Sequence, residues 1–214
     1  MRRIAAVLIA ALSLSSVARA ESMKIAAIPA LGPGEQKAMF SMGCFWSAET
    51  AFEGLPGVRA VISGFSGGTV ANPTYEQVSE GGTRHAETIL VIYDPKKISY
   101  AQLLDNFWHN IDPTQVDGQF CDRGDDYRTA IWTLNDDQKK QALDSKHTLE
   151  TTPQRFKGTI VTAIEPAGPF YAAEEYHQDF YRTHAGHYHA YRVGCGRDPA
   201  LTKLWGKPGR EAKV

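Results

Sequence analysis

Apolar positions along the chain follow two periods, one typical of strands and one typical of helices. Short β-rich runs predict five strands, at residues 37–42, 58–65, 88–93, 130–134 and 158–164. Helical spacing and turn signals predict four helices, at residues 45–52, 99–110, 135–149 and 171–182. The clearest helix is 99–110, because Ser99 and Gln102 form a capping box ahead of a continuous apolar face.

The predicted elements run in the order β-α-β-β-α-β-α-β-α, and the first six match the split βαβ, ferredoxin-like arrangement. We therefore expect an α+β fold with a mixed sheet covered by helices. The main domain spans residues 37–182, after an irregular segment at 21–36 and before an irregular tail at 183–214. The loop from 112 to 128 is long and lacks apolar periodicity, and long ordered loops are often functional.

The first twenty residues have the pattern of a secretory signal peptide. Arg2 and Arg3 supply a positive start, residues 4–17 are apolar, and Ala18 and Ala20 stand where a signal peptidase reads small residues. The apolar run is too short for a comfortable membrane span. We expect cleavage after Ala20 and a periplasmic or secreted product that is not attached to a membrane.

Composition and charge narrow the class of protein. The chain has 214 residues, of which 43% are hydrophobic and 22% charged, so it can bury a sizeable core without disulfides. Its net charge is −1, and loss of the three arginines in residues 1–20 would make it −4. An acidic balance argues against a nucleic-acid partner. The glycine loop 64–68 lacks the ending of a phosphate-binding loop, so no organic cofactor is expected.

The cysteines carry the first chemical signal. There are three, Cys44, Cys121 and Cys195, whereas a structural framework in a secreted protein normally uses pairs. Cys44 follows Gly43 at a strand-to-helix turn, where the helix N-terminus favours the thiolate and lowers the pKa of a thiol. A buried structural cysteine is the alternative, but the turn position favours a reactive one.

The segment Gly43–Glu49, GCFWSAE, is similar to the signature of the peptide methionine sulfoxide reductase A family. Further similar motifs follow in family order; they are LPGV at 55–58, GFSGG at 64–68, NPTY at 72–75, HAE at 85–87, YDP at 93–95, FW at 107–108, DP at 112–113, DRG at 122–124, YR at 127–128, FY at 170–171, AE at 173–174 and HQ at 177–178. Several motifs in register over residues 38–181 are far more specific than any one alone. The resemblance implies thiol-dependent reduction of methionine S-sulfoxide, peptide-bound or free, to methionine.

The resemblance also implies a role for individual side chains. A sulfoxide oxygen is a poor leaving group until it is protonated, so the site needs a carboxyl whose pKa an apolar pocket raises. The product beside methionine would be a sulfenic acid on the cysteine. The implied roles are Cys44 as nucleophile, Glu87 as acid, Tyr75 and Tyr127 as hydrogen-bond donors to the oxygen, Asp122 in substrate binding and orientation, and Phe45 and Trp46 as a cradle for the S-methyl group.

Each of these side chains also has a purely structural interpretation. Glu87 could be a surface carboxylate at a strand end, the two tyrosines could line the core rim, and Asp122 could cap a turn. Their joint register with Cys44 favours the catalytic interpretation. His85 is expected to be structural or to support the site from behind.

A sulfenic acid must be returned to the thiol by a second cysteine. We favour Cys195, because Gly194 and Gly196 permit the backbone bending that a mobile cysteine needs. Cys121, beside Asp122, is the rival and could act in a relay. The prediction is a Cys44–Cys195 disulfide after one turnover without reductant. Electrons would then arrive by thiol exchange from a thioredoxin-like partner, and we expect the enzyme to be a monomer.

A metal site and two alternative functions have weaker support in the sequence. His184, His187 and His189 could hold a metal, but a short histidine cluster without a cysteine or carboxylate in register is weak evidence, so none is expected. A cysteine hydrolase would pair Cys44 with a histidine such as His85 or His177, yet no hydrolase cysteine motif is present. A non-catalytic module that binds oxidised peptides would not need both Cys44 and Glu87.

Overall fold

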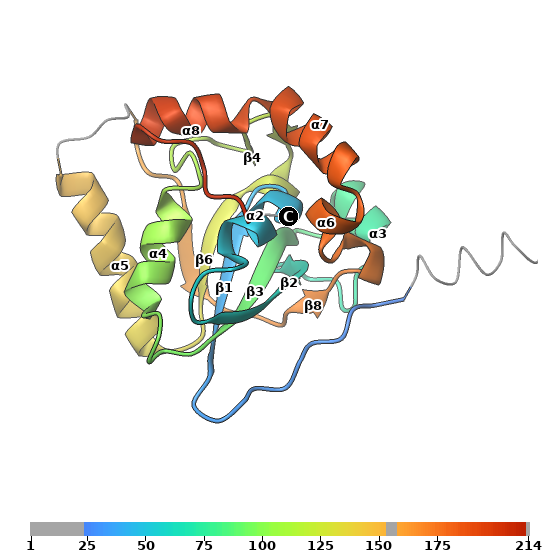
Figure 1. Ribbon diagram of the computed structural model, residues 1–214, viewed down its shortest axis with the longest axis horizontal. Coiled ribbons are helices and arrows are strands. Elements are labelled where there is room, and N and C mark those ends of the chain that lie inside the picture. Colours follow the sequence, from blue (N-terminus) through green and yellow to red (C-terminus); the bar gives the residue numbers. More distant parts are fainter. Residues whose placement is uncertain (1–23, 153–157, 213–214) are drawn as a thin grey trace, which may run out of the picture.

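The computed structural model describes residues 24–152 and 158–212, and its centre is a six-stranded sheet (Figure 1). The strands are β1 (Gln36–Met42), β2 (Val58–Ser66), β3 (Ala86–Tyr93), β6 (Thr129–Thr133), β7 (Ala163–Pro166) and β8 (Tyr171–Ala172). They lie in the order β7-β6-β1-β3-β2-β8, with every neighbouring pair antiparallel except β6 and β7. The four central strands are the first four of the predicted ones, so the ferredoxin-like α+β core is confirmed.

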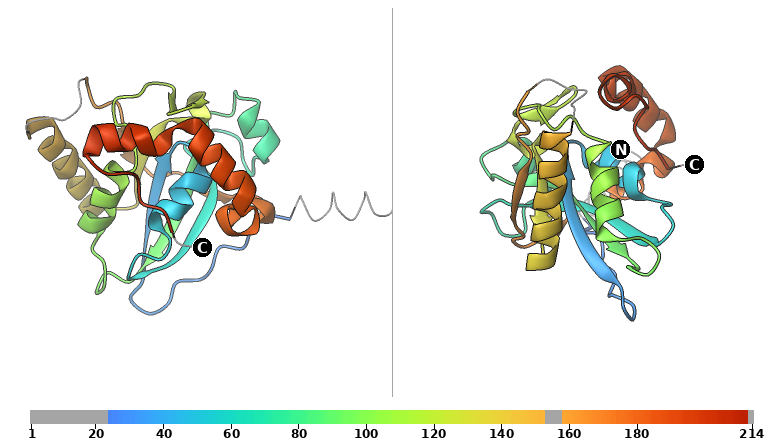
Figure 2. Two further views of the ribbon diagram at one scale, coloured as in Figure 1. Left: turned by 45° about the horizontal axis from the view of Figure 1, so that its top comes forward. Right: turned by 90° about the vertical axis from the view of Figure 1, so that its left-hand side faces the viewer.

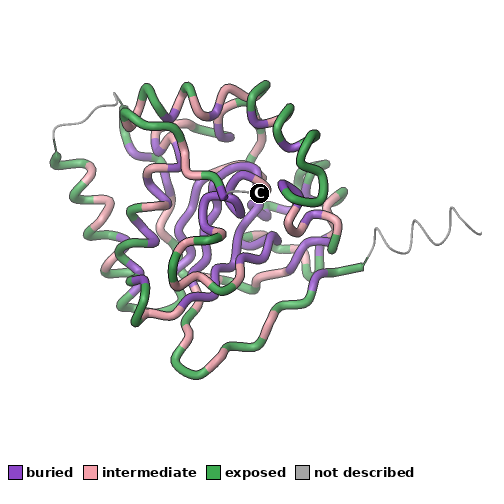
Figure 3. Tube along the Cα trace, viewed as in Figure 1, coloured by how far each residue is buried: buried purple, intermediate pink, exposed green. Residues whose placement is uncertain are grey.

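Helices α2 (Phe45–Phe52), α4 (Tyr100–Trp108) and α5 (Asp136–Thr151) form where the apolar spacing predicts them. The Ser99 hydroxyl accepts a hydrogen bond from the Gln102 N–H, and the Ser99 N–H donates one to the Gln102 side chain, which confirms the predicted capping box. Phe40 of β1 and Val91 of β3 point into the core that α2 and α4 cover. All eight residues of β3 are buried, so this strand is enclosed on both faces (Figure 3).

The other face of the sheet is covered by irregular chain. Met39, Leu90 and Trp132 form a second apolar cluster there, which partly buried loop residues such as Phe170 complete. The N-terminal segment runs along the edge of the sheet, and the Ala26 N–H donates to the carbonyl of Ala173. The irregular structure expected before residue 37 is therefore confirmed from residue 24 to the start of β1.

The prediction of one helix over 171–182 is wrong. Tyr171 and Ala172 form β8, which pairs with the end of β2. A 3-10 turn, η2 (Glu175–His177), and a short helix, α6 (Phe180–Thr183), follow. Asp179 between them has φ +51°, a left-handed conformation that no α-helix continues through. The predicted strand at 158–164 begins only at Ala163, and the five-residue helix α3 (Tyr75–Ser79) was not predicted.

The prediction of an irregular tail after residue 182 is also wrong. Helices α7 (Ala185–Cys195) and α8 (Arg197–Trp205) meet at Gly196 and lie over the N-terminal part of α2 (Figures 1 and 2). Within the described part of the chain, no helix has the length and apolar character that a bilayer span requires. The predicted signal peptide lies outside the described residues.

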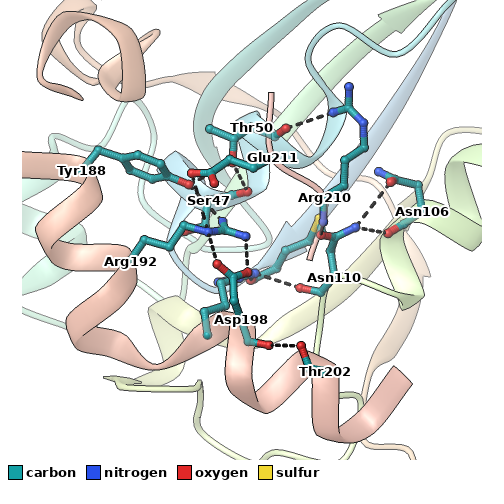
Figure 4. Close-up of polar contacts among 12 residues, drawn as sticks. Ser47, Thr50, Asn106, Asn110, Tyr188, Arg192, Asp198, Thr202, Arg210 and Glu211 are labelled. Atoms are coloured by element: carbon teal, nitrogen blue, oxygen red, sulfur yellow. Dashed lines mark hydrogen bonds and ion pairs between the residues drawn. The ribbon is translucent and has the colours of Figure 1, made fainter. Parts of the chain in front are cut away.

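Polar contacts attach these C-terminal helices to the rest of the fold (Figure 4). The buried Arg192 makes two hydrogen bonds to the carboxylate of Asp198, at 2.6 and 3.0 Å, and a third to the Tyr188 hydroxyl. That hydroxyl lies 3.0 Å from the hydroxyl of Thr50 in α2. Arg210 then donates to the carbonyl of Thr50 at 3.0 Å. Polar side chains, rather than a stripe of apolar ones, attach α7 and α8 to the rest of the fold. The apolar periodicity of the sequence therefore did not predict these two helices.

Candidate active site

The nucleophile turn, Gly43–Cys44 between β1 and α2, places a thiol at the start of a helix. Gly43 has φ +76°, and a Cβ there would lie 2.5 Å from the Cβ of Gln119, so only glycine fits. Cys44 is the N-cap of α2 and is 6% exposed. It is the free cysteine of the described residues, as the predicted nucleophile must be.

Glu87 reaches the same point from the middle of the sheet. It belongs to β3, is 3% exposed, and its Oε2 accepts a hydrogen bond of 2.8 Å from the Phe45 N–H, the residue after Cys44. Burial raises the pKa of Glu87 well above its ordinary value, and the Phe45 N–H opposes that change while Asp126 and Asp122 add to it. The carboxyl therefore holds a proton beside the thiol, as an acid for a sulfoxide oxygen requires.

The environment of the thiol differs from the sequence expectation. Burial raises the pKa of Cys44, and the carboxylates of Glu87 and Asp122 raise it further. Hydrogen bonds from the Tyr191 hydroxyl and the Trp46 N–H lower it, but they do not compensate. The expectation that the helix N-terminus gives a low thiol pKa is wrong here, because the site is closed to water. At rest the thiol and its neighbouring acid are both neutral, which suits an uncharged substrate.

Two phenols face this pair, as the sequence predicts. Tyr75 begins α3, and Tyr127 ends a 3-10 turn, η1 (Asp125–Tyr127), in the long loop after α4. Their hydroxyls share a hydrogen bond, and burial, with the nearby Glu87, raises the pKa of each. Both stay neutral and can donate a hydrogen bond without adding charge. The unpredicted α3 is thus the element that positions Tyr75, whose N–H donates to Glu174.

Phe45 and Trp46 begin an aromatic wall beside Cys44, and the Tyr75 ring adjoins it, 4.4 Å from the His177 ring. The Phe45 ring lies 4.9 Å from the His177 ring, centroid to centroid, and Trp46 stacks on Phe180 at 3.8 Å. Trp46 donates its indole N–H to His177 Nδ1 at 3.2 Å, and burial lowers the pKa of His177 to about 4 against an opposing effect of Glu76. The wall is therefore neutral and apolar, as a methyl pocket should be.

Neither histidine of the hydrolase alternative is placed as a base for Cys44. His177 is part of the aromatic wall, and its Nδ1 is occupied by Trp46. His85 lies under the glycine loop, where its Nδ1 accepts from the Gly68 N–H at 3.1 Å and its Nε2 lies 2.7 Å from the Val70 carbonyl oxygen. His85 is structural, as expected, and the hydrolase hypothesis is not favoured.

The sequence analysis missed two side chains of the C-terminal helices that reach this site. The Tyr191 hydroxyl donates to Asp122 Oδ2 at 2.6 Å, and the Cys44 sulfur lies within hydrogen-bonding reach of the same hydroxyl. The buried Arg197 donates to the carbonyl of Met42 at the end of β1. Tyr191 stands four residues before Cys195, one helical turn away, and this spacing was the available signal.

The two remaining cysteines are bonded to each other. Cys121 and Cys195 form a disulfide with Cα atoms 5.0 Å apart, while Cys44 is free. Cys121 lies at the tip of a small hairpin, β4 (Gly118–Gln119) and β5 (Asp122–Arg123), and its side chain is exposed. The cysteines treated as rivals on sequence grounds are thus partners, and the predicted Cys44–Cys195 bond is not the one present.

The structure does not gather the three tail histidines around one point. His184 stacks on Phe180 and His187 meets the same ring edge-on. Among the described residues, the groups with metal-ligand spacing are Cys121–Asp122–Cys195 and Glu49–Glu53–Asp179. The first has its sulfurs in the disulfide, and neither includes a tail histidine.

A buried free thiol beside a buried carboxyl, in a chain whose other two cysteines form a disulfide that reaches the surface, is the arrangement of a thiol-dependent oxidoreductase. The chain belongs to the peptide methionine sulfoxide reductase family, whose model matches residues 36–208. It is 46% identical to the peptide methionine sulfoxide reductase MsrA of Bacillus licheniformis over 170 residues, which cover 79% of this chain and 93% of that protein.

Solved structures of the family have the same fold. Methionine sulfoxide reductase A of Corynebacterium diphtheriae superposes with a TM-score of 0.68 at 31% identity, over 78% of this chain and 89% of that one. Mxr1 of Saccharomyces cerevisiae in reduced form gives a TM-score of 0.68 at 28% identity, over 73% and 90%. The protein is accordingly a methionine sulfoxide reductase that uses thiols as its source of electrons.

Proposed function

We propose that the residues around Cys44 carry out oxygen transfer in the roles that the sequence resemblance implies. The Cys44 sulfur attacks the sulfoxide sulfur, Glu87 protonates the oxygen, and the hydroxyls of Tyr75 and Tyr127 donate hydrogen bonds to it. The sulfur–oxygen bond of the substrate breaks, and the oxygen ends on Cys44 as a sulfenic acid. The proton of the Cys44 thiol replaces the one that Glu87 gave, so the products are methionine and a neutral Cys44–SOH.

The observation that carries this proposal is the bond between the Phe45 N–H and Glu87. It anchors the acid to the residue next to the nucleophile, so the two reacting groups keep a fixed relation. The S epimer is the one that the family resemblance implies, and the arrangement of the side chains supports selection of a single epimer. The oxygen must face Glu87 and the phenols while the methyl group faces Phe45 and Trp46, and only one arrangement about the chiral sulfur meets both walls. Asp122, held by Tyr191, orients the rest of the substrate.

The assay that tests this assignment is a single turnover of the fully reduced enzyme on a methionine sulfoxide peptide without added reductant, followed as methionine formed per enzyme. Cys44→Ser should form no methionine, whereas Cys121→Ser should form one equivalent, because it keeps the nucleophile and the acid. Full turnover by Cys44→Ser would show that the central role is wrong. Methionine formation also separates a reductase from a module that only binds oxidised peptides.

Return of Cys44 to its thiol form proceeds through the other two cysteines. We favour Cys195 as the first to attack, which forms a Cys44–Cys195 disulfide and releases water. Cys121 then attacks the Cys195 sulfur and expels Cys44, which leaves the Cys121–Cys195 disulfide seen in the structure. The observed bond supports a relay in which both cysteines act.

The order within the relay is tested by disulfide mapping after one turnover without reductant. Cys121→Ser should hold a Cys44–Cys195 bond, because its second step is blocked. Cys195→Ser should retain the sulfenic acid, which a dimedone probe would label. A fast Cys44–Cys121 bond in Cys195→Ser would reverse the order.

A thioredoxin-like dithiol protein is the reductant that fits the disulfide. Cys121 is exposed, so an incoming thiolate can reach its sulfur, while Cys44 is buried and out of reach. Exchange through a mixed disulfide transfers two electrons and leaves both cysteines as thiols. A partner with only one of its two cysteines should be trapped on Cys121 or Cys195, and capture on Cys44 would contradict this route.

The proposed place of action is outside the cytoplasm. The pattern of residues 1–20 supports export and cleavage after Ala20, which gives a periplasmic or secreted enzyme without membrane attachment. N-terminal sequencing of protein purified from the bacterial periplasm should begin at Glu21. Full-length chain confined to the cytoplasm would contradict export. Gel filtration of the mature protein should give the mass of a monomer.

A further inference from the structure

Two arginines of the C-terminal helices are buried, but they differ in their partners. Arg192 is paired with the carboxylate of Asp198 through two hydrogen bonds. Arg197 is 1% exposed, and within the residues that the structure describes no carboxylate lies within ion-pair distance of it. Its Nη1 has no hydrogen-bond partner there either. The Asp122 carboxylate acts on Arg197 only from beyond ion-pair distance. A buried charge without a close counter-ion is expensive to keep, so Arg197 calls for a reason beyond packing.

The contacts of Arg197 join the segments that bear the three cysteines. Its Nη2 donates to the carbonyls of Met42 and Asn110, at 3.0 and 2.9 Å. Met42 immediately precedes the nucleophile turn. The guanidinium lies over the ring of Phe120, 4.6 Å from its centroid, and Phe120 precedes Cys121. Arg197 itself follows Cys195 by two residues, with only Gly196 between them.

The unpartnered nitrogen is turned toward the nucleophile turn. A Cβ placed on Gly43 would lie 3.8 Å from Arg197 Nη1, the next atom out after the Gln119 side chain. The glycine therefore leaves the guanidinium close to the backbone that carries Cys44. The interaction between Arg197 and Cys44 is electrostatic rather than a direct bond.

The relay contains one step that needs a positive charge at this place. When Cys121 attacks the Cys195 sulfur, the Cys44–Cys195 bond breaks and its electron pair leaves with Cys44 as a thiolate. Burial makes this thiolate costly, and exchange slows when the leaving thiol has a high pKa. The groups facing Cys44 are Glu87 and Asp122, which oppose the thiolate, the phenols of Tyr75, Tyr127 and Tyr191, the Trp46 N–H, and Arg197.

We propose that Arg197 is a positioning residue of the relay, whose buried guanidinium holds a positive charge beneath the nucleophile turn and stabilises Cys44 as the departing thiolate. Its bonds to Met42 and Asn110 keep that charge in place while Cys195 changes partners at the flexible Gly194 and Gly196. The charge is the same whichever cysteine attacks first. The proposal rests on the cysteine relay proposed above only for the step at which the charge is used.

The first experiment measures the effect of the Arg197 charge on the ionisation of Cys44 in a protein that cannot carry out the relay. In a Cys121→Ser, Cys195→Ser background, the rate of iodoacetamide alkylation of Cys44 is followed against pH. Arg197→Met should move the midpoint up by about one to three pH units, which is roughly a tenfold to thousandfold loss of rate below both midpoints. Arg197→Lys, which keeps the positive charge, should restore most of the lost rate. Arg192→Met is the matched control, because Arg192 is buried but paired with Asp198, and its midpoint should not move.

An unchanged midpoint in a folded Arg197→Met protein would overturn the proposal, and so would an equal shift in Arg192→Met. If Arg197→Met does not fold, Arg197→Gln takes its place, because the amide can still donate to a carbonyl but carries no charge. The same upward shift is expected there, and its absence has the same meaning.

The second experiment tests whether the Arg197 charge speeds the disulfide exchange of the relay. With all three cysteines present, one turnover is run without reductant and the disulfides are quenched and mapped against time. Arg197→Met should form one methionine per enzyme, yet pass from the Cys44-linked disulfide to Cys121–Cys195 at least about tenfold more slowly. A shifted alkylation midpoint with an unchanged exchange rate would leave the charge in place but overturn its use in exchange.

Discussion

The sheet side of the active site and the C-terminal layer are built in different ways. On the sheet side, Cys44 and Glu87 are fixed by backbone: Cys44 lies at a helix start, Glu87 lies in a central strand, and the Phe45 N–H next to Cys44 donates to Glu87 at 2.8 Å. In the C-terminal layer, α7 and α8 are attached through side chains, and glycines flank Cys195 on both sides. The first region is closed and apolar, whereas the second meets solvent at the disulfide.

The difference matches the two halves of the reaction. Oxygen transfer needs an acid and a nucleophile at a fixed separation. It also needs a site without water, because burial is what keeps the carboxyl protonated. Thiol exchange needs sulfurs that change partners and a surface that a second protein can reach. The fold separates these demands by placing the buried thiol and carboxyl under a layer that carries the solvent-exposed disulfide.

The largest test of this division is Cys195→Ser assayed with a thioredoxin-like protein as the only reductant. Methionine formation should stop after one equivalent per enzyme, because the reductant cannot reach the buried Cys44. The rate of that first equivalent should equal that of the parent enzyme. Dithiothreitol, which is small enough to enter, should restore repeated turnover.

Loss of the first equivalent in Cys195→Ser would break the comparison, because it would place Cys195 in oxygen transfer itself. Cys121→Ser serves as the partner variant. It should also give one equivalent at the parent rate, since neither cysteine belongs to the sheet side.

The sheet side was largely predictable from sequence. Its strands show alternating or continuous apolar runs, and the Gly43–Cys44 turn and the motif containing Glu87 are local signals in a fixed register. The C-terminal layer was not predictable by the same means. Helix α7 reads AGHYHAYRVGC and buries only Tyr188 and Arg192, so no apolar stripe marks it as a helix. Its stability comes from contacts to Asp198 and Thr50, which are defined only after folding.

The site residues divide in the same way, into those marked by local sequence motifs and those that only the tertiary fold brings to the site. The residues that local motifs single out lie around Cys44, including Tyr75 on an unpredicted helix. The missed residues Tyr191 and Arg197 reach the site from a distant segment. The pKa of Cys44 was also mispredicted, because a helix start argues for a low value while the enclosure, which is a tertiary property, raises it.

The second prediction concerns the acid on the sheet side. Glu87→Gln keeps the size and can still accept the Phe45 N–H, but it cannot supply a proton. The first-turnover rate should fall by about 10²- to 10⁴-fold, the usual contribution of a general acid. Rapid quench and quantification of methionine measure it.

The pH dependence sharpens this result. Burial raises the pKa of Glu87 well above its ordinary value, so the acid keeps its proton to higher pH than an exposed glutamic acid and loses it as pH rises through that raised value. The parent rate should therefore fall on the alkaline side. In Glu87→Gln that fall should disappear, and the residual rate should follow ionisation of Cys44 upward. An alkaline fall that persists in Glu87→Gln would mean that another group is the acid.

The third prediction concerns the residue that joins the two regions. Tyr191→Phe removes the bonds to Asp122 and to the Cys44 sulfur while the ring remains. A hydrogen bond to a charged group contributes about 1.5–3 kcal/mol, so the first-turnover rate should fall by roughly tenfold to a hundredfold. Since Tyr191 lowers the pKa of Cys44, the alkylation midpoint should also rise. If neither the first-turnover rate nor the alkylation midpoint changes, Tyr191 contributes to packing alone.

The smallest effect is expected inside the C-terminal layer, at a residue that holds it down without touching the pocket. Tyr188→Phe removes the hydroxyl that bridges Thr50 and Arg192, and it leaves one buried donor of Arg192 without a partner. The free energy of unfolding should fall by about 1–3 kcal/mol, measured by urea denaturation. The first-turnover rate should stay within about twofold of the parent, because the sheet side keeps its own backbone contacts. A larger loss in that rate would show that the layer positions Cys44 and Glu87, and the two regions would then have to be treated as one.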